Sequence, residues 1–298
     1  MTSYELYHDE SMEKGYWHGI LLVPMEKKGF LLDYLEQVRR NTSYDDPLSI
    51  KKVKRKNRVF DCATSWVQIG LGFMRSRTKT QPFPVSLGKQ GRQRIFVNLP
   101  PEATKLKFIL FRERDNHETM TGYPDRASKI ETTFRFGIKG GMHFLGSDDQ
   151  PIHIEKMHFD GHKHHLRHLD HDRIVGRLQG LREYCSISER ADIIDDRSSD
   201  HRVERGQSYE DCQLLQLTDL LIGSFRTALG IATRNIHKEL AHLPRELILD
   251  YQKGYARMRN SRWFNSFWLS ECYLQNDRWQ FKTLEILGSD TDKQLSLF

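Results

Sequence analysis

The sequence has few of the features that mark zinc-ribbon, disulfide-rich or membrane proteins. Its 298 residues include four cysteines, at positions 62, 185, 212 and 272, and none of them has the close paired spacing of metal ligands. Separated cysteines of this kind are typical of reduced, buried thiols. The longest apolar runs, residues 19–23 and 220–223, are too short to span a bilayer, and a charged-then-apolar leader is absent. We therefore expect a cytoplasmic protein with no membrane association.

An excess of positive charge is present and it is clustered. The chain has 46 basic and 40 acidic residues, which gives a formal net charge of +6. The densest basic run consists of Lys51, Lys52, Lys54, Arg55, Lys56 and Arg58. A second basic region, residues 75–94, is rich in Gly, Pro, Lys and Arg and is predicted to form a loop. A single run of this kind is usually solvated surface, but two runs that bracket one predicted helix favour a polyanion such as nucleic acid.

Hydrophobic periodicity predicts alternating strands and helices. Strands are expected at residues 4–9, 16–24, 105–112, 152–160, 191–195 and 279–286, and helices at residues 28–40, 58–74, 124–145, 173–184, 212–230 and 244–258. This order indicates an α/β fold with a mixed central sheet flanked by helices. We expect one domain over residues 1–230 with a basic insertion at about 28–100 after the second strand, a helical and aromatic appendage over 231–288, and a flexible tail over 289–298.

Three carboxylates are candidates for a common site. Asp9 ends the first predicted strand, Asp160 ends the strand at 152–160, and Asp219 lies inside an apolar helix. Glu10, which follows Asp9, is a further candidate catalytic acid. Each has an ordinary alternative: solvation of a turn for Asp9 and Glu10, an Asp-Gly turn for Asp160, and a salt bridge to an arginine for Asp219. Together, however, convergent carboxylates are what paired Mg²⁺ or Mn²⁺ ions require for phosphodiester hydrolysis.

Three motifs carry a resemblance to a known family. The run from Tyr7 to Ser11, the strand that ends in Asp160, and the helix Leu215-Gln216-Leu217-Thr218-Asp219-Leu220-Leu221-Ile222-Gly223 resemble the signatures of a widespread prokaryotic domain family of unknown function. That family has a ribonuclease H-like fold and is usually described as metal-dependent nucleases. The resemblance covers roughly residues 4–230. It implies that Asp9, Asp160 and Asp219 are metal ligands, with Glu131 as the candidate for the fourth acid of such enzymes.

A group of histidines surrounds Asp160 in the sequence. It comprises His153, His158, His162, His164, His165, His168 and His171. Such a cluster can bind Zn²⁺ or Ni²⁺, although a histidine-rich loop is more often polar surface and oxygen-rich sites favour Mg²⁺ or Mn²⁺. We consider His162 and His164 as candidates for a proton shuttle or a phosphate contact.

The C-terminal part contributes two further features. The aromatic residues Trp263, Phe264, Phe267, Trp268 and Tyr273 are expected to pack against the core, with stacking on exposed bases as the alternative. The last five residues, Gln294, Leu295, Ser296, Leu297 and Phe298, resemble the short peptide by which bacterial polymerases and repair proteins bind the replication sliding clamp. A mobile terminus with apolar anchors is a usual form of such a groove-binding peptide.

These observations lead to two hypotheses of different classes. The first is a divalent-metal-dependent nuclease that acts on DNA more readily than on RNA, since the clamp-like tail points to replicated or repaired DNA. The second is a catalytically inactive module of the same fold that binds nucleic acid or protein. A binding module has no need for three convergent acids, so the acids favour the nuclease.

Overall fold

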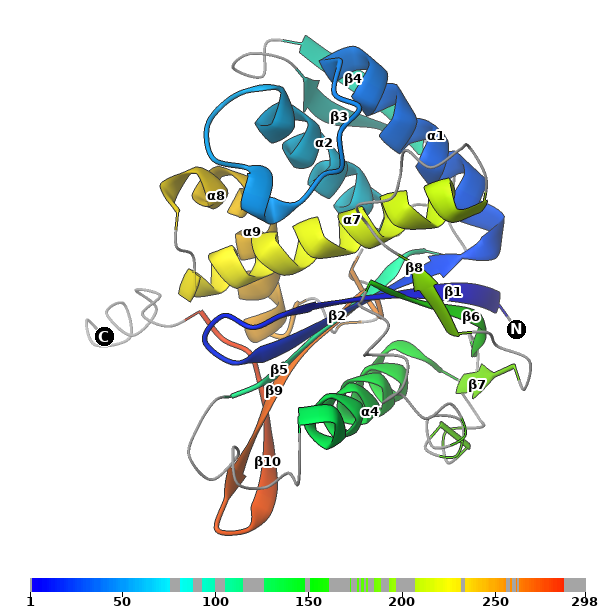
Figure 1. Cartoon of the computed structure of the whole chain (residues 1–298), viewed down its shortest axis with the longest axis vertical. Coiled ribbons are helices and arrows are strands. Elements are labelled where there is room, and N and C mark those ends of the chain that lie inside the picture. Colours follow the sequence, from blue (N-terminus) through cyan, green and yellow to red (C-terminus); the bar gives the residue numbers. More distant parts are fainter. Residues whose placement is uncertain are drawn as a thin grey trace.

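A computed structural model defines the architecture around a large central sheet. It describes residues 2–75, 81–87, 93–99, 105–114, 126–147, 151–160, 185–188, 193–196, 207–231, 234–255 and 263–286, together with single positions between 172 and 181 and between 258 and 261. Figure 1 shows the sheet crossing the middle of the molecule, with helices on both of its faces. The mixed α/β architecture predicted from the sequence is therefore confirmed.

The sheet has eight strands and mixed direction. Its strands are β1 (Thr2–Ser11), β2 (Tyr16–Pro24), β5 (Lys107–Glu113), β6 (Ile152–Asp160), β7 (Cys185–Ile187), β8 (Ile193–Asp196), β9 (Phe267–Gln275) and β10 (Arg278–Thr283). Their order is β10-β9-β5-β2-β1-β6-β7. β7 pairs with the first part of β6, and β8 pairs with its last part. β2 is antiparallel to both of its neighbours, β1 and β5, whereas β6 is parallel to β1, β7 and β8. β1 and β6 are therefore adjacent parallel strands, and their carboxyl ends lie at the same edge of the sheet.

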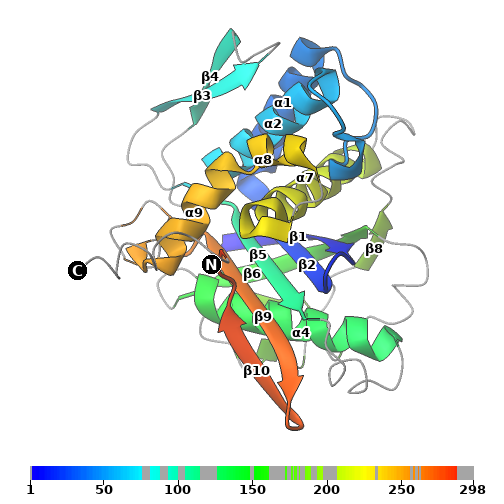
Figure 2. The same cartoon turned by 90° about the vertical axis from the view of Figure 1, so that its left-hand side faces the viewer.

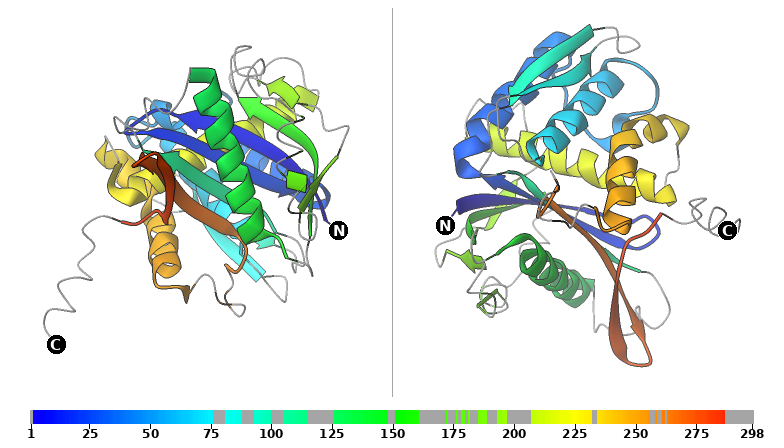
Figure 3. Two further views of the ribbon diagram at one scale, coloured as in Figure 1. Left: turned by 90° about the horizontal axis from the view of Figure 1, so that it is seen from below. Right: turned by 180° about the vertical axis from the view of Figure 1, so that it is seen from behind.

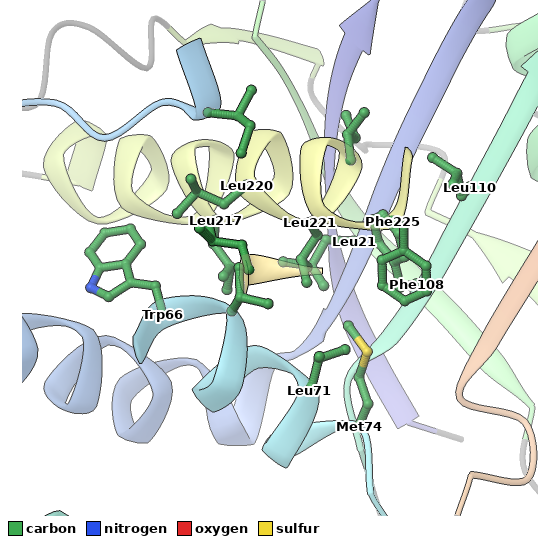
Figure 4. Close-up of a cluster of buried hydrophobic side chains, with 14 of the residues drawn as sticks. Leu21, Trp66, Leu71, Met74, Phe108, Leu110, Leu217, Leu220, Leu221 and Phe225 are labelled. Carbon is green, nitrogen blue, oxygen red and sulfur yellow. The ribbon is translucent and has the colours of Figure 1, made fainter. Parts of the chain in front are cut away.

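Two hydrophobic cores hold the helices onto the sheet. Helices α1 (Met25–Thr42), α2 (Arg58–Phe73) and α7 (Gln207–Arg226) cover one face, and α4 (Arg126–Leu145) covers the other, as Figure 3 also shows. In Figure 4, Leu217, Leu221 and Phe225 of α7 lie between α2 and the sheet. Beyond α7 the chain continues through a π-helical turn (Thr227–Ile231), α8 (Asn235–Leu240) and α9 (His242–Gln252).

Helix α7 is long, apolar and largely buried. The stretch Tyr209–Ile231 is long and apolar enough to cross a membrane by length and composition, but 89% of its most apolar window is buried inside the protein. It approaches the sheet closely because Gly19 of β2 has no side chain: a Cβ there would lie 2.1 Å from Cγ1 of Ile222. The burial is that of a core helix in a globular protein.

The structure differs from the sequence prediction in two places. The predicted loop, residues 75–94, contains β3 (Gln81–Leu87) and the start of β4 (Gln93–Leu99), which pair as an antiparallel hairpin beside α2 (Figure 2). The prediction of a loop is wrong for these residues, because prolines are tolerated in the edge strands of a small hairpin. The region predicted as an appendage supplies β9, which joins the central sheet parallel to β5, and β10 follows it. Most of the helix expected at 173–184 lies outside the described residues.

Candidate functional site

The carboxyl ends of β1, β6 and β8 bring acidic positions together. The parallel register of β1 and β6 pairs His8 with Phe159, so Asp9 and Asp160 follow side by side. On the other side of β6, Asp160 pairs with Asp196, the last residue of β8. Asp196 is an acidic position that the sequence prediction did not consider. The backbone therefore places Asp9, Asp160 and Asp196 in a row along one edge of the sheet; the side chains of the last two lie outside the described part.

Alternation along β1 decides which face each side chain occupies. Leu6 belongs to the core under α4, whereas Tyr7 belongs to the core under α7. Because successive residues of a strand point to opposite faces, Asp9 faces α7 and Glu10 faces α4. Asp9 is 8% exposed, and its Oδ1 accepts a 2.7 Å hydrogen bond from the amide of Glu10. Consecutive carboxylates thus serve opposite sides of the sheet.

Asp219 lies on a polar face of α7 that holds a segment of the basic insertion. Its Oδ2 accepts a 2.7 Å hydrogen bond from the amide of Ile50. One turn earlier, Oε1 of Gln216 accepts a 2.7 Å hydrogen bond from the amide of Leu48 and a 2.8 Å hydrogen bond from the guanidinium of Arg39. The sequence offered a salt bridge to an arginine as the alternative for Asp219, and the hydrogen bond described here is with a backbone amide.

Asp219 also lies toward the end of the sheet where Asp9 is found. Arg226 follows it by two helical turns and therefore shares its side of α7. The guanidinium of Arg226 donates a hydrogen bond to Oγ of Ser11, two residues beyond Asp9. Thr218, the neighbour of Asp219, packs near Gly19, which is the β2 partner of Asp9. Arg226, on the side of α7 that carries Asp219, thus reaches the carboxyl end of β1.

Glu131 occupies the opposite face of the sheet at the same end. It is 6% exposed, and one of its carboxylate oxygens lies 3.2 Å from Nε of Arg135. Phe134, one turn later on α4, packs against His8 and Phe159 with ring centroids 4.9 and 5.3 Å apart. Those two residues immediately precede Asp9 and Asp160. The amino-terminal part of α4 therefore brings Glu131 toward the edge that carries the other acids.

The basic run is exposed beside Asp219. The side chains of Lys51, Lys52, Lys54, Arg55, Lys56 and Arg58 are all exposed. A short 3₁₀ turn, Ile50–Lys52, begins the run, and its first residue is the one bonded to Asp219. Lys56 forms an exposed 2.8 Å ion pair with Glu239. Positive charge is therefore attached directly to the helix that carries the acid.

A second group of charged residues lies buried between β1 and α7, and the sequence did not reveal it. The ammonium of Lys28 lies 2.7 Å from Glu5 and 2.8 Å from Asp211. The oxygen of the Tyr7 hydroxyl lies 2.5 Å from Glu5 and 2.8 Å from Asp211, so its one proton is within reach of both carboxylates, and the ring of His158 stacks on Tyr7. Glu5, His158 and Asp211 have the residue types of a metal site. Lys28 already lies between the two carboxylates and shares its single positive charge between them.

Burial and partners shift the pKa values in this buried group. Burial alone would raise the pKa of Glu5, but hydrogen bonds from Lys28 and Tyr7 and the charge of Lys28 outweigh it and lower this pKa. Burial would lower the pKa of Lys28, yet its bonds to Asp211 and Glu5 raise it. Burial, together with the two carboxylates, raises the pKa of Tyr7 well above 10. At neutral pH the lowered pKa keeps Glu5 ionised and the raised pKa keeps Lys28 protonated.

The remaining predicted residues have simpler outcomes. His153 contacts Ser186 at 2.7 Å, and His158 is buried. The predicted packing role of the aromatic group is confirmed for Phe267, which is part of the core, and for Trp268, which stacks on Phe111. Other predicted residues lie outside the described part of the chain, namely His162, His164, His165, His168, His171 and residues 294–298.

Comparison with known proteins adds no relative. No protein-family model matches the chain, and no curated protein matches it. The arrangement of residues in this structure is therefore the basis for a functional proposal.

Proposed function

We propose that the protein is a divalent-metal-dependent nuclease that hydrolyses the phosphodiesters of nucleic acid, with Asp9, Asp160 and Asp219 as its metal ligands. The observation that supports this most directly is the parallel register of β1 and β6, which makes Asp9 and Asp160 neighbours at one sheet edge. Asp219 lies on the side of α7 that carries Arg226, which reaches the same end. Glu131 and Asp196 add acidic positions there, and both are candidates for a supporting role.

The donor set fits Mg²⁺ or Mn²⁺. Carboxylate oxygens are the preferred ligands of these hard cations, and Asp9 and Asp219 offer such oxygens on the same face of the sheet. Bound divalent ions would neutralise charge on the phosphate and lower the pKa of an attacking water. Asp9 and Asp219 would hold the ions, Asp160 would complete the ligand set from the neighbouring strand, and Arg226 would hold the hydroxyl of Ser11 beside Asp9.

The exposed basic run supports nucleic acid as the substrate. Nucleic-acid affinity comes largely from cations that neutralise backbone phosphates. The run from Lys51 to Arg58 begins at the residue bonded to Asp219, so a phosphate backbone bound there would pass close to the acids. This proximity is the reason to favour a polyanionic substrate over a small phosphate ester.

The second candidate is a catalytically inactive module that binds nucleic acid or protein. The bond between Ile50 and Asp219 favours it, because a carboxylate that anchors a backbone segment has a structural reason to be present. In that case the acids at the sheet edge would contribute only to the stability of the fold. The two candidates differ in whether removal of one negative charge changes chemistry or only stability.

Cleavage of labelled single- and double-stranded DNA and RNA in the presence of Mn²⁺ tests the proposal. Asp9→Asn, Asp160→Asn and Asp219→Asn should each abolish cleavage with little change in the fold, because an asparagine at 219 keeps an oxygen that can accept from Ile50. Asp33→Asn, at an exposed acid on α1, is the matched control and should cleave normally. Full activity in two of the three site variants, or no cleavage by the wild type, would contradict the nuclease.

The tail supplies a preference for DNA and a cellular setting. We propose that residues 294–298 bind a bacterial replication sliding clamp and that the protein acts in the cytoplasm. The basis is the resemblance described above. The measurement is binding of the purified protein to a bacterial sliding clamp with and without these five residues. Equal binding by the truncated protein, or no binding by either at micromolar concentration, would remove the main reason to prefer DNA over RNA.

A further inference from the structure

The face of the sheet opposite Asp9 carries a compact group of nitrogen and oxygen ligands. It consists of His8 and Glu10 on β1 and His18 on β2. Glu10 and His18 are directly opposite each other in the antiparallel register, and His8 lies two residues from Glu10 on the same face. The hairpin that begins the chain therefore brings two imidazoles and a carboxylate together without help from distant sequence.

The spacing of the two imidazoles suits a shared metal ion. Nε2 of His8 lies 2.9 Å from Nδ1 of His18. Bonds from a metal to imidazole nitrogen are about 2.0–2.1 Å, so neighbouring ligands of a six-coordinate ion are about 3 Å apart. The potential ligand atoms of His8, Glu10 and His18 all lie within 4.8 Å of one another. Two histidines and one carboxylate form a common ligand set for divalent first-row transition metals.

Thr133 of α4 orients His18 for this purpose. Its hydroxyl lies 2.7 Å from Nε2 of His18 and donates its own proton to the carbonyl of Lys129 at 2.7 Å. The Thr133 oxygen is thus an acceptor, Nε2 of His18 carries the proton, and Nδ1 presents its lone pair toward His8. A metal-bound histidine typically donates its second ring N–H to a fixed partner in this way. In the metal-free protein, the same lone pair accepts from Nε2 of His8.

We propose that His8, Glu10 and His18 form a binding site for a divalent first-row transition metal, separate from the carboxylate site on the other face. The two histidines are 1% and 0% exposed, whereas Glu10 is partly exposed and gives the ion a path from solvent. Imidazole ligands prefer such metals to Mg²⁺, so this site and an all-oxygen site would select different ions. Occupancy would tie β1 to β2 at the residue next to Asp9.

Cobalt binding by the full-length protein is the test, because Co²⁺ ligated by imidazole has a visible absorption spectrum. Excess Mg²⁺ is present to fill oxygen sites, and the five histidines at 162, 164, 165, 168 and 171 are replaced by Gln to remove competing imidazoles. We expect about one Co²⁺ per chain after dialysis, and a higher Tm than in the metal-free protein. His18→Gln and Glu10→Gln should each weaken binding by about 10-fold or more, and Thr133→Val by about 10-fold.

Two controls separate this site from misfolding and from the proposed nuclease site. His237→Gln changes a buried histidine that contacts the carbonyl of Val53, and it should keep Co²⁺ binding. Asp9→Asn should keep Co²⁺ binding and lose cleavage. Failure of the His8–Glu10–His18 site and failure of the nuclease proposal are therefore distinguishable. Retention of Co²⁺ by His18→Gln and Glu10→Gln would overturn the site. Absence of bound Co²⁺ in the protein that keeps His8, Glu10 and His18 would also overturn the site. The two histidines would then be a hydrogen-bonded pair only.

Discussion

The amide of Ile50 and the carboxylate of Asp219 are joined by a 2.7 Å hydrogen bond, so the start of the basic run is fixed to the central helix of the core. Gly223, one turn further along α7, allows this approach. A Cβ at position 223 would lie 2.3 Å from Cγ1 of Ile50. The basic run and the carboxylate of Asp219 are thus positioned by the same contact.

Gly223→Ala should therefore displace the basic segment. The added methyl overlaps the side chain of Ile50, and overpacking of this kind costs about 1–3 kcal/mol of unfolding free energy. Nucleic-acid affinity should fall as well, since the segment no longer lies against Asp219. Urea unfolding and a binding titration measure the two effects.

A compensating change makes the origin of this effect testable. Ile50→Ala removes Cγ1 and Cδ1, two of the three Ile50 atoms that the new methyl would meet, and keeps Cβ at 2.7 Å, so the double variant should recover part of the stability that Gly223→Ala loses. Gly29→Ala is the control, because a Cβ there meets nothing within 4 Å. If the double variant lost as much unfolding free energy as the two single variants together, the two residues would not share this contact.

Lys28→Met should be strongly destabilising. The ammonium of Lys28 lies between the buried carboxylates of Glu5 and Asp211, and its side chain is 14% exposed. Removal of one partner from a buried ion group typically costs about 3–5 kcal/mol, because the remaining charges lose their compensation. Lys27→Met, one residue earlier, is the control. Replacement of Glu5 by Gln in the Lys28→Met background should restore part of the loss in urea unfolding.

This buried ion group also illustrates the limits of the sequence. Alternating and helical patterns predicted the β1–β2 hairpin, the strand β6 and the helix α7, since these patterns report which side of an element is buried. Lys28 and Asp211 are 183 positions apart and meet only because α1 and α7 pack on the same face. No local pattern carries that information, and Lys28 in isolation has the appearance of a surface residue.

The same reasoning applies to the candidate site. The positions of Asp9 and Asp160 at strand ends followed from the pattern, and parallel pairing makes them neighbours. The anchoring of Ile50 by Asp219 did not follow, because it depends on the path of a loop. β9 was missed because its pairing with β5 joins residues such as Phe108 and Phe267, which are far apart in the chain.

The shifted pKa values of the buried ion group predict a pH dependence of stability. The pKa of Glu5 is lower in the folded protein than its unfolded value near 4.5, so the unfolded chain binds more protons in that range. The stabilisation is complete above the unfolded value and is lost as pH falls through the folded one. For Lys28 the pKa is raised above 10.5, so its contribution is complete below that value and is lost as pH rises further.

Unfolding free energies between pH 3 and pH 7 check the acid side of this dependence. The wild type should lose stability more steeply than Glu5→Gln, which has no carboxylate to protonate at that position. Glu26→Gln, at an exposed acid on α1, should keep the wild-type slope. A slope in Glu5→Gln equal to that of the wild type would mean that other carboxylates dominate the acid response.

The last prediction concerns the exposed basic run and separates a binding surface from ordinary solvated charge. Replacement of Lys51, Lys52, Lys54, Arg55 and Lys56 by Gln should weaken nucleic-acid binding at low salt. It should also flatten the dependence of affinity on salt, because binding through fewer phosphate contacts releases fewer counterions. If the run contacts a backbone at several phosphates, the slope of log affinity against log salt should change by about 0.7–0.9 per lost contact.

A charge-matched control makes that result specific to position. Lys139, Lys238, Lys253, Lys282 and Arg278 lie on other elements, and their joint replacement by Gln removes the same formal charge. If long-range attraction to the net charge of +6 were the whole effect, both variants would lose affinity equally. A selective loss in the basic-run variant would place the phosphate backbone beside Ile50 and Asp219. An unchanged salt slope in that variant would return the run to solvated surface, and the proposed route of the substrate to the acids would be wrong.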